Sequence, residues 1–252
     1  MYLPVDESWA FTQIRTGNWS LHGHSAALYK GTRRLDVLKS KAYRFSTVPG
    51  LRTSLTKNRD GSHYDWLLNG LPSWQQYPLR NSSIVGSSCK GTASQYGPVW
   101  RVVLPNKGRV VLCPARDLWY SFDSTLVALG LGGADLDLRR FNEAITSVQK
   151  YLGLVPPDGY TGLVELLNNV ASANPLPDNS LAITTTRFVK AVQEQEGRIE
   201  AWLDEMFAPT AHGFCLHSTV SFTRLFTHSN QEVWTDSECL LIEDRMFSEW
   251  SG

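Results

Sequence analysis

The spacing of apolar residues changes twice along the chain, and this change limits the folds that the chain can adopt. Before about residue 123, short segments rich in β-branched and aromatic residues alternate with turns that contain Gly or Pro. From 124 to 207, apolar residues recur at helical intervals, and after Pro209 strand-like segments return. The pattern predicts an α+β fold, in which both ends of the chain form a mixed or antiparallel β core around a central helical block.

Within this outline, the sequence predicts one α+β domain over residues 1–252, with 124–207 as a helical insertion. Residues 99–104 and 109–113 have the composition of two strands joined by a short turn, which is typical of a β-hairpin. The longest helix is expected over residues 180–207, because apolar residues follow a helical stripe there and Pro209 stands beyond its end.

Composition narrows the class of protein. The chain has 252 residues, of which 42% are hydrophobic, with nine Trp, nine Tyr and ten Phe, so a substantial core is expected rather than disorder. The formal net charge is zero, which argues against nucleic acid as a main ligand. No stretch approaches the ~18 apolar residues of a membrane span, and the N-terminus lacks the pattern of an export signal, so we expect a soluble protein.

The cysteines and histidines do not predict a metal site. The four cysteines form no CxxC pair, and no Cys/His cluster has the spacing of a zinc site. Buried free thiols in a reducing, cytoplasmic compartment fit this pattern best, although the sequence also allows up to two disulfides. The six histidines include no HExxH motif. A Walker loop and a GxSxG nucleophile motif are absent as well.

An acidic pair near the C-terminus, Asp236 and Glu238, is the first candidate for a functional site. The two carboxylates would project from one face of an extended chain, just before the apolar run Cys239–Ile242. The same spacing occurs at Asp135/Asp137 and Glu194/Glu196, so the pair taken alone favours a solvated strand end over a site. The pair indicates a functional site only if residues earlier in the chain supply the other groups that such a site needs.

Such partners occur in order on predicted strands. Arg44 lies in the strand predicted over residues 42–48, and Ser87 and Ser88 close a second strand, over residues 82–89. With Asp236-Ser-Glu238 as the third motif, the chain resembles the ADP-ribosyltransferase fold of bacterial toxins and phage enzymes. That family carries Arg on its first core strand, a Ser-Thr-Ser-type motif on the second, and Glu-x-Glu before a short apolar strand. Here Gly86 stands first in the middle motif, and Asp236 stands where the family often has Glu or Gln.

The resemblance implies an NAD-dependent mono-ADP-ribosyltransferase, with NAD as co-substrate and a protein as acceptor. Glu238 would stabilise the positive charge that develops on the ribose when the nicotinamide bond breaks. Arg44 would bind an NAD phosphate, and Ser87 or Ser88 would orient Glu238. Asp236 would position or deprotonate the acceptor. The aromatic side chains of Tyr96 and Trp119 would pack on nicotinamide or adenine.

Two other functions remain open. The segments 99–122 and 232–234 also resemble uncharacterised proteins of tailed phages, which suggests a non-catalytic structural or interaction protein of a phage virion, with phage structural proteins as partners. A hydrolase that uses Asp236 and Glu238 is a third hypothesis, although two side chains so close together would not flank a glycosidic bond. The spatial arrangement of Arg44, Ser88 and Glu238 discriminates among these hypotheses.

Overall fold

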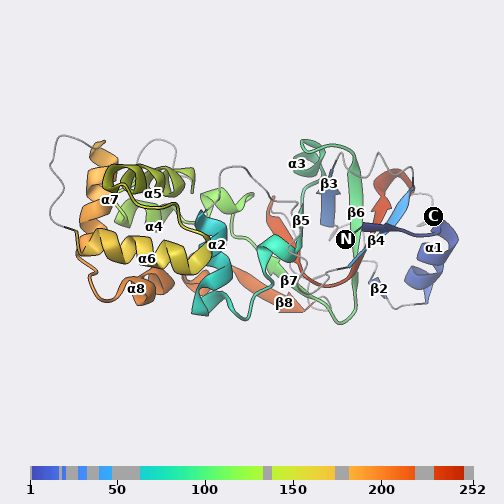
Figure 1. The fold of residues 1–252 in the computed structure, drawn as a ribbon. Coiled ribbons are helices and arrows are strands. Elements are labelled where there is room, and N and C mark those ends of the chain that lie inside the picture. The colour runs from blue at the N-terminus through green and yellow to red at the C-terminus, as the bar shows by residue number, and fades with distance from the viewer. Residues whose placement is uncertain are drawn as a thin grey trace. The chain divides into compact units, whose positions relative to one another are not determined.

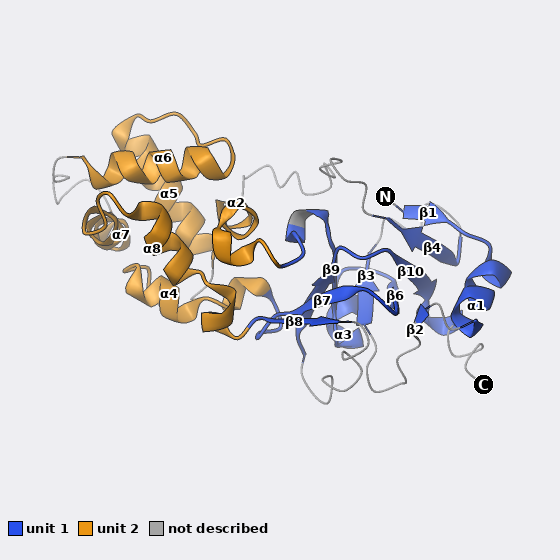
Figure 2. Ribbon diagram, turned by 90° about the horizontal axis from the view of Figure 1, so that it is seen from below, with its two compact units in different colours: residues 1–55, 77–117, 214–252 blue, residues 56–76, 118–213 orange. Residues whose placement is uncertain are grey.

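The computed structural model describes residues 2–16, 19–20, 28–32, 40–46, 63–132, 138–173, 182–218 and 230–246. The chain forms two compact units, which Figure 2 colours separately. One unit contains all the strands of the described residues, and the other is helical. Among the described residues, no helix combines the length and apolar character that crossing a bilayer requires.

The strand-containing unit comprises residues 1–55, 77–117 and 214–252. Its strands are β1 (Tyr2–Pro4), β2 (Trp19–Ser20), β3 (Leu28–Gly31), β4 (Ala42–Phe45), β5 (Ile84–Ser87), β6 (Val99–Pro105), β7 (Arg109–Leu112), β8 (Cys215–Ser218), β9 (Glu232–Thr235) and β10 (Cys239–Glu243). Their order is β1-β4-β10-β6-β3-β5-β9-β7-β8, with β2 paired to β6. Figure 1 draws the strands as arrows, coloured from blue near the N-terminus to red near the C-terminus. Every pairing is antiparallel. The predicted α+β class, with an antiparallel sheet built from both ends of the chain, is therefore confirmed.

The predicted hairpin of residues 99–113 is wrong. Both strands and the turn between them exist, and the amide of Gly108 donates to the carbonyl of Pro105. However, β6 pairs with β10 and β3, whereas β7 pairs with β9 and β8. The chain therefore turns a corner in the sheet instead of folding back on itself.

A second segment turns the same corner beside the first. Leu240 lies opposite Val103, and Trp234 lies opposite Val111. Between these pairs are seven residues, 104–110, on one segment and five, 235–239, on the other, so the β6–β7 segment carries two extra residues. Extra residues in one strand bend it, and strands that change direction in this way form the corners of folded sheets.

The core explains why the last strand has a continuous apolar sequence. Cys239 and Leu241 pack into a large cluster on one face of the sheet, and Leu240 and Ile242 pack into a smaller one on the other face. A strand that is buried on both faces needs apolar residues at successive positions. The second cluster includes Ile14 of helix α1 (Glu7–Arg15), which is capped by Asp6.

Position 86 requires glycine for a steric reason. A Cβ atom at Gly86 would overlap the carbonyl oxygen of Tyr29 on the neighbouring strand β3. We therefore expect Gly86→Ala to lower the free energy of unfolding by about 1–3 kcal/mol, the usual cost of overpacking. Gly91→Ala is the matched control, because the nearest atom to its Cβ is Cys89 Sγ at 3.7 Å. Equal stability of the two variants in urea denaturation would contradict this explanation.

The helical unit comprises residues 56–76 and 118–213, and thus extends beyond the predicted block of 124–207. Its helices are α2 (His63–Gly70), η3 (Pro72–Trp74), η5 (Leu118–Tyr120), α4 (Asp123–Ala128), α5 (Arg139–Leu152), α6 (Gly159–Ala171), α7 (Ile183–Gln193), α8 (Ile199–Met206) and η6 (Pro209–His212). Phe141 lies at the centre of an aromatic core, edge-on to Phe188 and Phe207.

The long helix expected over residues 180–207 is two helices, α7 and α8. Gly197 separates them with a φ of 78°, a left-handed conformation that ends a helix. The apolar stripe continues on both sides because both helices bury side chains in the same unit, such as Phe188 and Trp202. Periodicity alone therefore did not reveal the break.

Candidate functional site

The structure brings Arg44 and Glu238 together. They are 194 positions apart in sequence, but their strands β4 and β10 are neighbours, and Arg44 lies opposite Leu240. The Nε atom of Arg44 donates to Oε1 of Glu238, and this hydrogen bond is the main reason why the pKa of Arg44 is raised. Both side chains are substantially exposed, at 44% and 35%, so the ion pair contributes little to stability.

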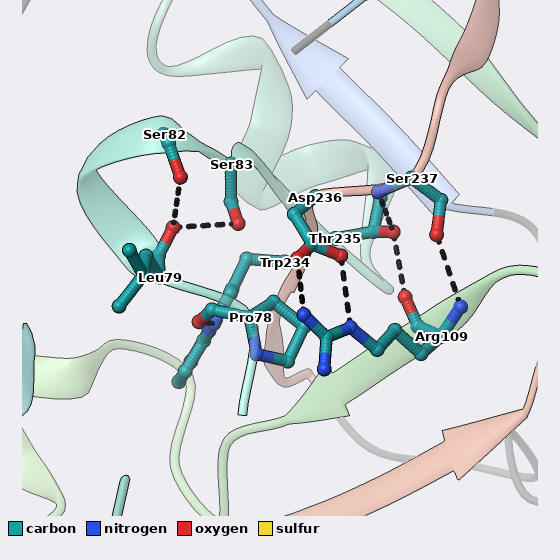
Figure 3. Close-up of polar contacts among 9 residues, drawn as sticks. All are labelled: Pro78, Leu79, Ser82, Ser83, Arg109, Trp234, Thr235, Asp236 and Ser237. Atoms are coloured by element: carbon teal, nitrogen blue, oxygen red, sulfur yellow. Dashed lines mark hydrogen bonds and ion pairs between the residues drawn. The ribbon is translucent and has the colours of Figure 1, made fainter. Parts of the chain in front are cut away.

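Asp236 has a different partner, Arg109 at the start of β7. The Nε and Nη2 atoms of Arg109 donate to the two carboxylate oxygens of Asp236 at 3.2 and 2.6 Å. Figure 3 shows this fork, together with the contacts that Ser237 and Thr235 make to the backbone of Arg109. The two acids thus do not act as a joint pair. Each neutralises its own arginine, and Asp236 helps to hold the corner of the sheet.

Thr235 is the buried centre of this corner. Its hydroxyl donates to the carbonyl of Arg109 at 2.6 Å and accepts from the amide of Ser237 at 3.0 Å, and the residue is fully buried. Thr235→Val keeps the shape but leaves both backbone groups without this partner, so we expect a loss of about 1–3 kcal/mol in the free energy of unfolding. Equilibrium denaturation measures it. Thr146→Val, at a half-buried position of α5, is the control, and an equal loss there would contradict the proposed role of the corner.

Ser87 and Ser88 are not at Glu238. Ser88 Oγ accepts from the amide of Gln231 at 2.9 Å, and Ser87 Oγ donates to Oδ1 of Asn230 at 3.4 Å. These contacts are at the start of β9, whereas Glu238 follows its end. The three residue steps of extended strand from Glu232 to Thr235 alone span about 10 Å. The expectation that one of these serines orients Glu238 is therefore not met by the geometry.

Another glutamate lies beside Ser87. The register places Tyr29 opposite Ser87, and Ser87 opposite Glu232, so the three side chains form a row on one face of β3, β5 and β9. Glu232 is only 7% exposed. Its Oε1 accepts from Nε of Arg80 at 3.0 Å, and the Arg80 side chain is 17% exposed. We name Tyr29, Ser87, Glu232 and Arg80 the polar row.

Sequence reasoning missed Glu232 as a site residue because its segment was interpreted as strand sequence and as part of the resemblance to phage proteins. The signal in the sequence was an acidic residue at the first position of a strand-like segment. The structure buries all four residues of that strand. A carboxylate is rarely buried unless it is paired, so its burial indicates a specific partner. Burial itself, however, depends on the sheet that covers it.

Tyr96, predicted to contact the cofactor, lies near the polar row. The residue is 60% exposed. Partial burial raises the pKa of its hydroxyl, and the negative charges of Asp117 and Glu232 raise it further. Trp119, the second aromatic candidate, belongs to the helical unit, where it packs edge-on against Tyr64 with ring centroids 4.9 Å apart.

The remaining chemical groups do not define a site of their own. All four cysteines lie in described segments and none forms a disulfide. Hydrogen bonds from Thr92 lower the pKa of Cys89, which is half-buried after β5. Within the described ranges, no group of three or more His, Cys, Asp or Glu side chains is placed to hold a metal ion.

In comparisons with known proteins, no protein-family model, no curated protein and no solved structure matches the chain. Functional reasoning therefore depends on the geometry of this chain. Two of its arginine-paired carboxylates are candidates for a catalytic role, Glu238 with Arg44 and Glu232 with Arg80. Of the two, Glu232 has a serine opposite it and an exposed tyrosine nearby.

Proposed function

We propose that the chain is an NAD-dependent mono-ADP-ribosyltransferase that acts on a protein acceptor, and that Glu232 supplies its carboxylate. The observation that supports this proposal is the position of Ser87 directly opposite Glu232 on neighbouring strands. The chemistry needs a carboxylate whose place is fixed and a hydroxyl beside it. The polar row provides both on one face of the sheet, whereas Glu238 has no serine of this motif near it.

The reaction breaks the bond between the ribose C1′ atom and the nicotinamide nitrogen. Nicotinamide leaves with the electron pair of that bond, which neutralises its ring, and the ribose becomes positively charged. A nucleophile of the acceptor then bonds to C1′ and loses its proton to a base or to solvent. Glu232 would stabilise the charge on the ribose, and its burial strengthens this effect because the surroundings screen charge less than water does.

The exposed ring of Tyr96 supports the same assignment. An aromatic face that is open to solvent beside a buried carboxylate suits the stacking of nicotinamide or adenine. Lys90 and Arg101 share Asp244 near Tyr29, with Arg101 5.5 Å from the centre of the Tyr29 ring. These cations would offset part of the negative charge of the NAD diphosphate.

The direct test uses purified protein and NAD labelled in its adenine part. We expect release of nicotinamide, together with transfer of label to an acceptor protein or release of ADP-ribose into water. A folded protein, verified by circular dichroism, that gives neither product with cell extract as the source of acceptors would contradict the proposed enzyme.

One observation favours a second candidate, a non-catalytic structural or interaction protein of a phage particle. The contacts of Asp236, Ser237 and Thr235 all stabilise a corner of the sheet. In that case the acidic motif stabilises the fold and takes no part in a reaction. Stable incorporation of the chain into a purified particle, combined with no NAD cleavage, would support this candidate.

A further inference from the structure

The backbone that carries Arg80 is held in place on both sides. Arg80 opens the short 3₁₀ helix η4 (Arg80–Ser82), directly before β5. On one side, the indole nitrogen of Trp234 donates to the carbonyl of Pro78 at 3.0 Å. On the other, the hydroxyls of Ser82 and Ser83 both donate to the carbonyl of Leu79, at 3.1 and 2.8 Å, as Figure 3 shows. These contacts fix the position of the backbone from which the Arg80 side chain extends to Glu232.

The contact between the side chains of Arg80 and Glu232 is also held in one place. Arg80 Nε lies 3.0 Å from Glu232 Oε1, with the two side chains 17% and 9% exposed. A glutamate has several rotatable bonds, and a planar guanidinium restricts it more than a lysine ammonium does. Because little water reaches the pair, solvent cannot replace this contact if it is removed. A second arginine–glutamate pair at the sheet, Arg44 with Glu238, is far more exposed.

We propose that Arg80 is a positioning residue, whose guanidinium holds the carboxylate of Glu232 in its place opposite Ser87. This inference depends on the proposed function, because it assigns Arg80 a role in that reaction. Arg80 acts through Glu232 and makes no contact with the reacting atoms. Removing it should therefore lower the rate of the chemical step and leave the binding of NAD nearly unchanged.

The experiment measures kcat and KM for NAD cleavage in wild type, Arg80→Met and Arg80→Lys. We expect Arg80→Met to reduce kcat about 10- to 100-fold, as small displacements of a catalytic group do, with KM within about threefold of wild type. Arg80→Lys keeps the charge without the planar fork and should recover part of kcat. In Arg80→Ala, which leaves a cavity where the guanidinium was, added guanidinium ion should also raise the rate. A purely structural salt bridge predicts instead a lower free energy of unfolding, with the kcat of the folded variant unchanged.

The control is Arg198→Met, which removes the exposed pair of Arg198 with Glu205 in the helical unit and should leave kcat as in wild type. If Arg80→Met does not fold, Arg80→Gln, which retains hydrogen-bond donors, takes its place. A folded variant with kcat within twofold of wild type, or with only KM raised, would overturn this inference and leave the proposed function standing. If the wild-type protein does not cleave NAD, the proposed function is wrong, and the role proposed for Arg80 is wrong as well.

Discussion

Replacing Glu232 by glutamine should lower the rate of NAD cleavage about 100-fold or more, in line with the loss of one preorganised electrostatic contact in other enzymes. The amide has nearly the shape of the carboxylate but carries no negative charge, so it cannot stabilise a positively charged ribose. Glu232 is 7% exposed and lies opposite Ser87, so no other described carboxylate takes its place in the polar row. Release of nicotinamide from NAD at saturating concentration measures the effect.

Glu238→Gln provides the matched control, with the same substitution six positions further along the chain. Glu238 is paired with Arg44 on exposed surface, away from the two serines, so we expect a smaller loss of activity there. The reverse order, with Glu238→Gln the more damaging substitution, would return the catalytic role to the carboxylate that the sequence motif suggested. Circular dichroism should accompany both variants, because Glu232→Gln also removes the charge that faces Arg80.

Trp234→Ala should lower the free energy of unfolding by about 3–5 kcal/mol, the range for a fully buried aromatic residue. Trp234 is completely buried on β9, and its ring lies 6.0 Å from that of Phe214. Its indole nitrogen also donates to the carbonyl of Pro78. The substitution removes all of these contacts and leaves a cavity under the segment that carries Arg80. Equilibrium unfolding in urea measures the loss.

Two controls separate the contributions of Trp234. Trp234→Phe keeps most of the apolar contact and removes the hydrogen bond to Pro78, so it should cost clearly less than alanine. Trp9→Ala, on the partly exposed surface of α1, should cost under about 1 kcal/mol. A loss at Trp234→Ala no larger than at Trp9→Ala would show that Trp234 does not anchor the sheet as described.

Local signals in the sequence predicted the elements that depend on neighbouring residues. Helix α5 ends where Gly153 adopts a left-handed conformation, with a φ of 64°, as glycine after an apolar helical stripe indicates. Strand β10 is an unbroken apolar run because the sheet buries both of its faces. Strand composition likewise indicated β6 and β7, but not the strands with which they pair.

The sequence by itself determined the α+β class, a β core built from both ends of the chain, and the residue types available for chemistry. Only the tertiary structure decided which of these residues meet. It places Ser87 opposite Glu232, 145 positions later, and puts Glu238 with Arg44. The physical reason is strand register: composition defines a strand locally, but a side chain's cross-strand neighbour depends on pairing between distant segments, and a shift along β9 would give Ser87 a different partner.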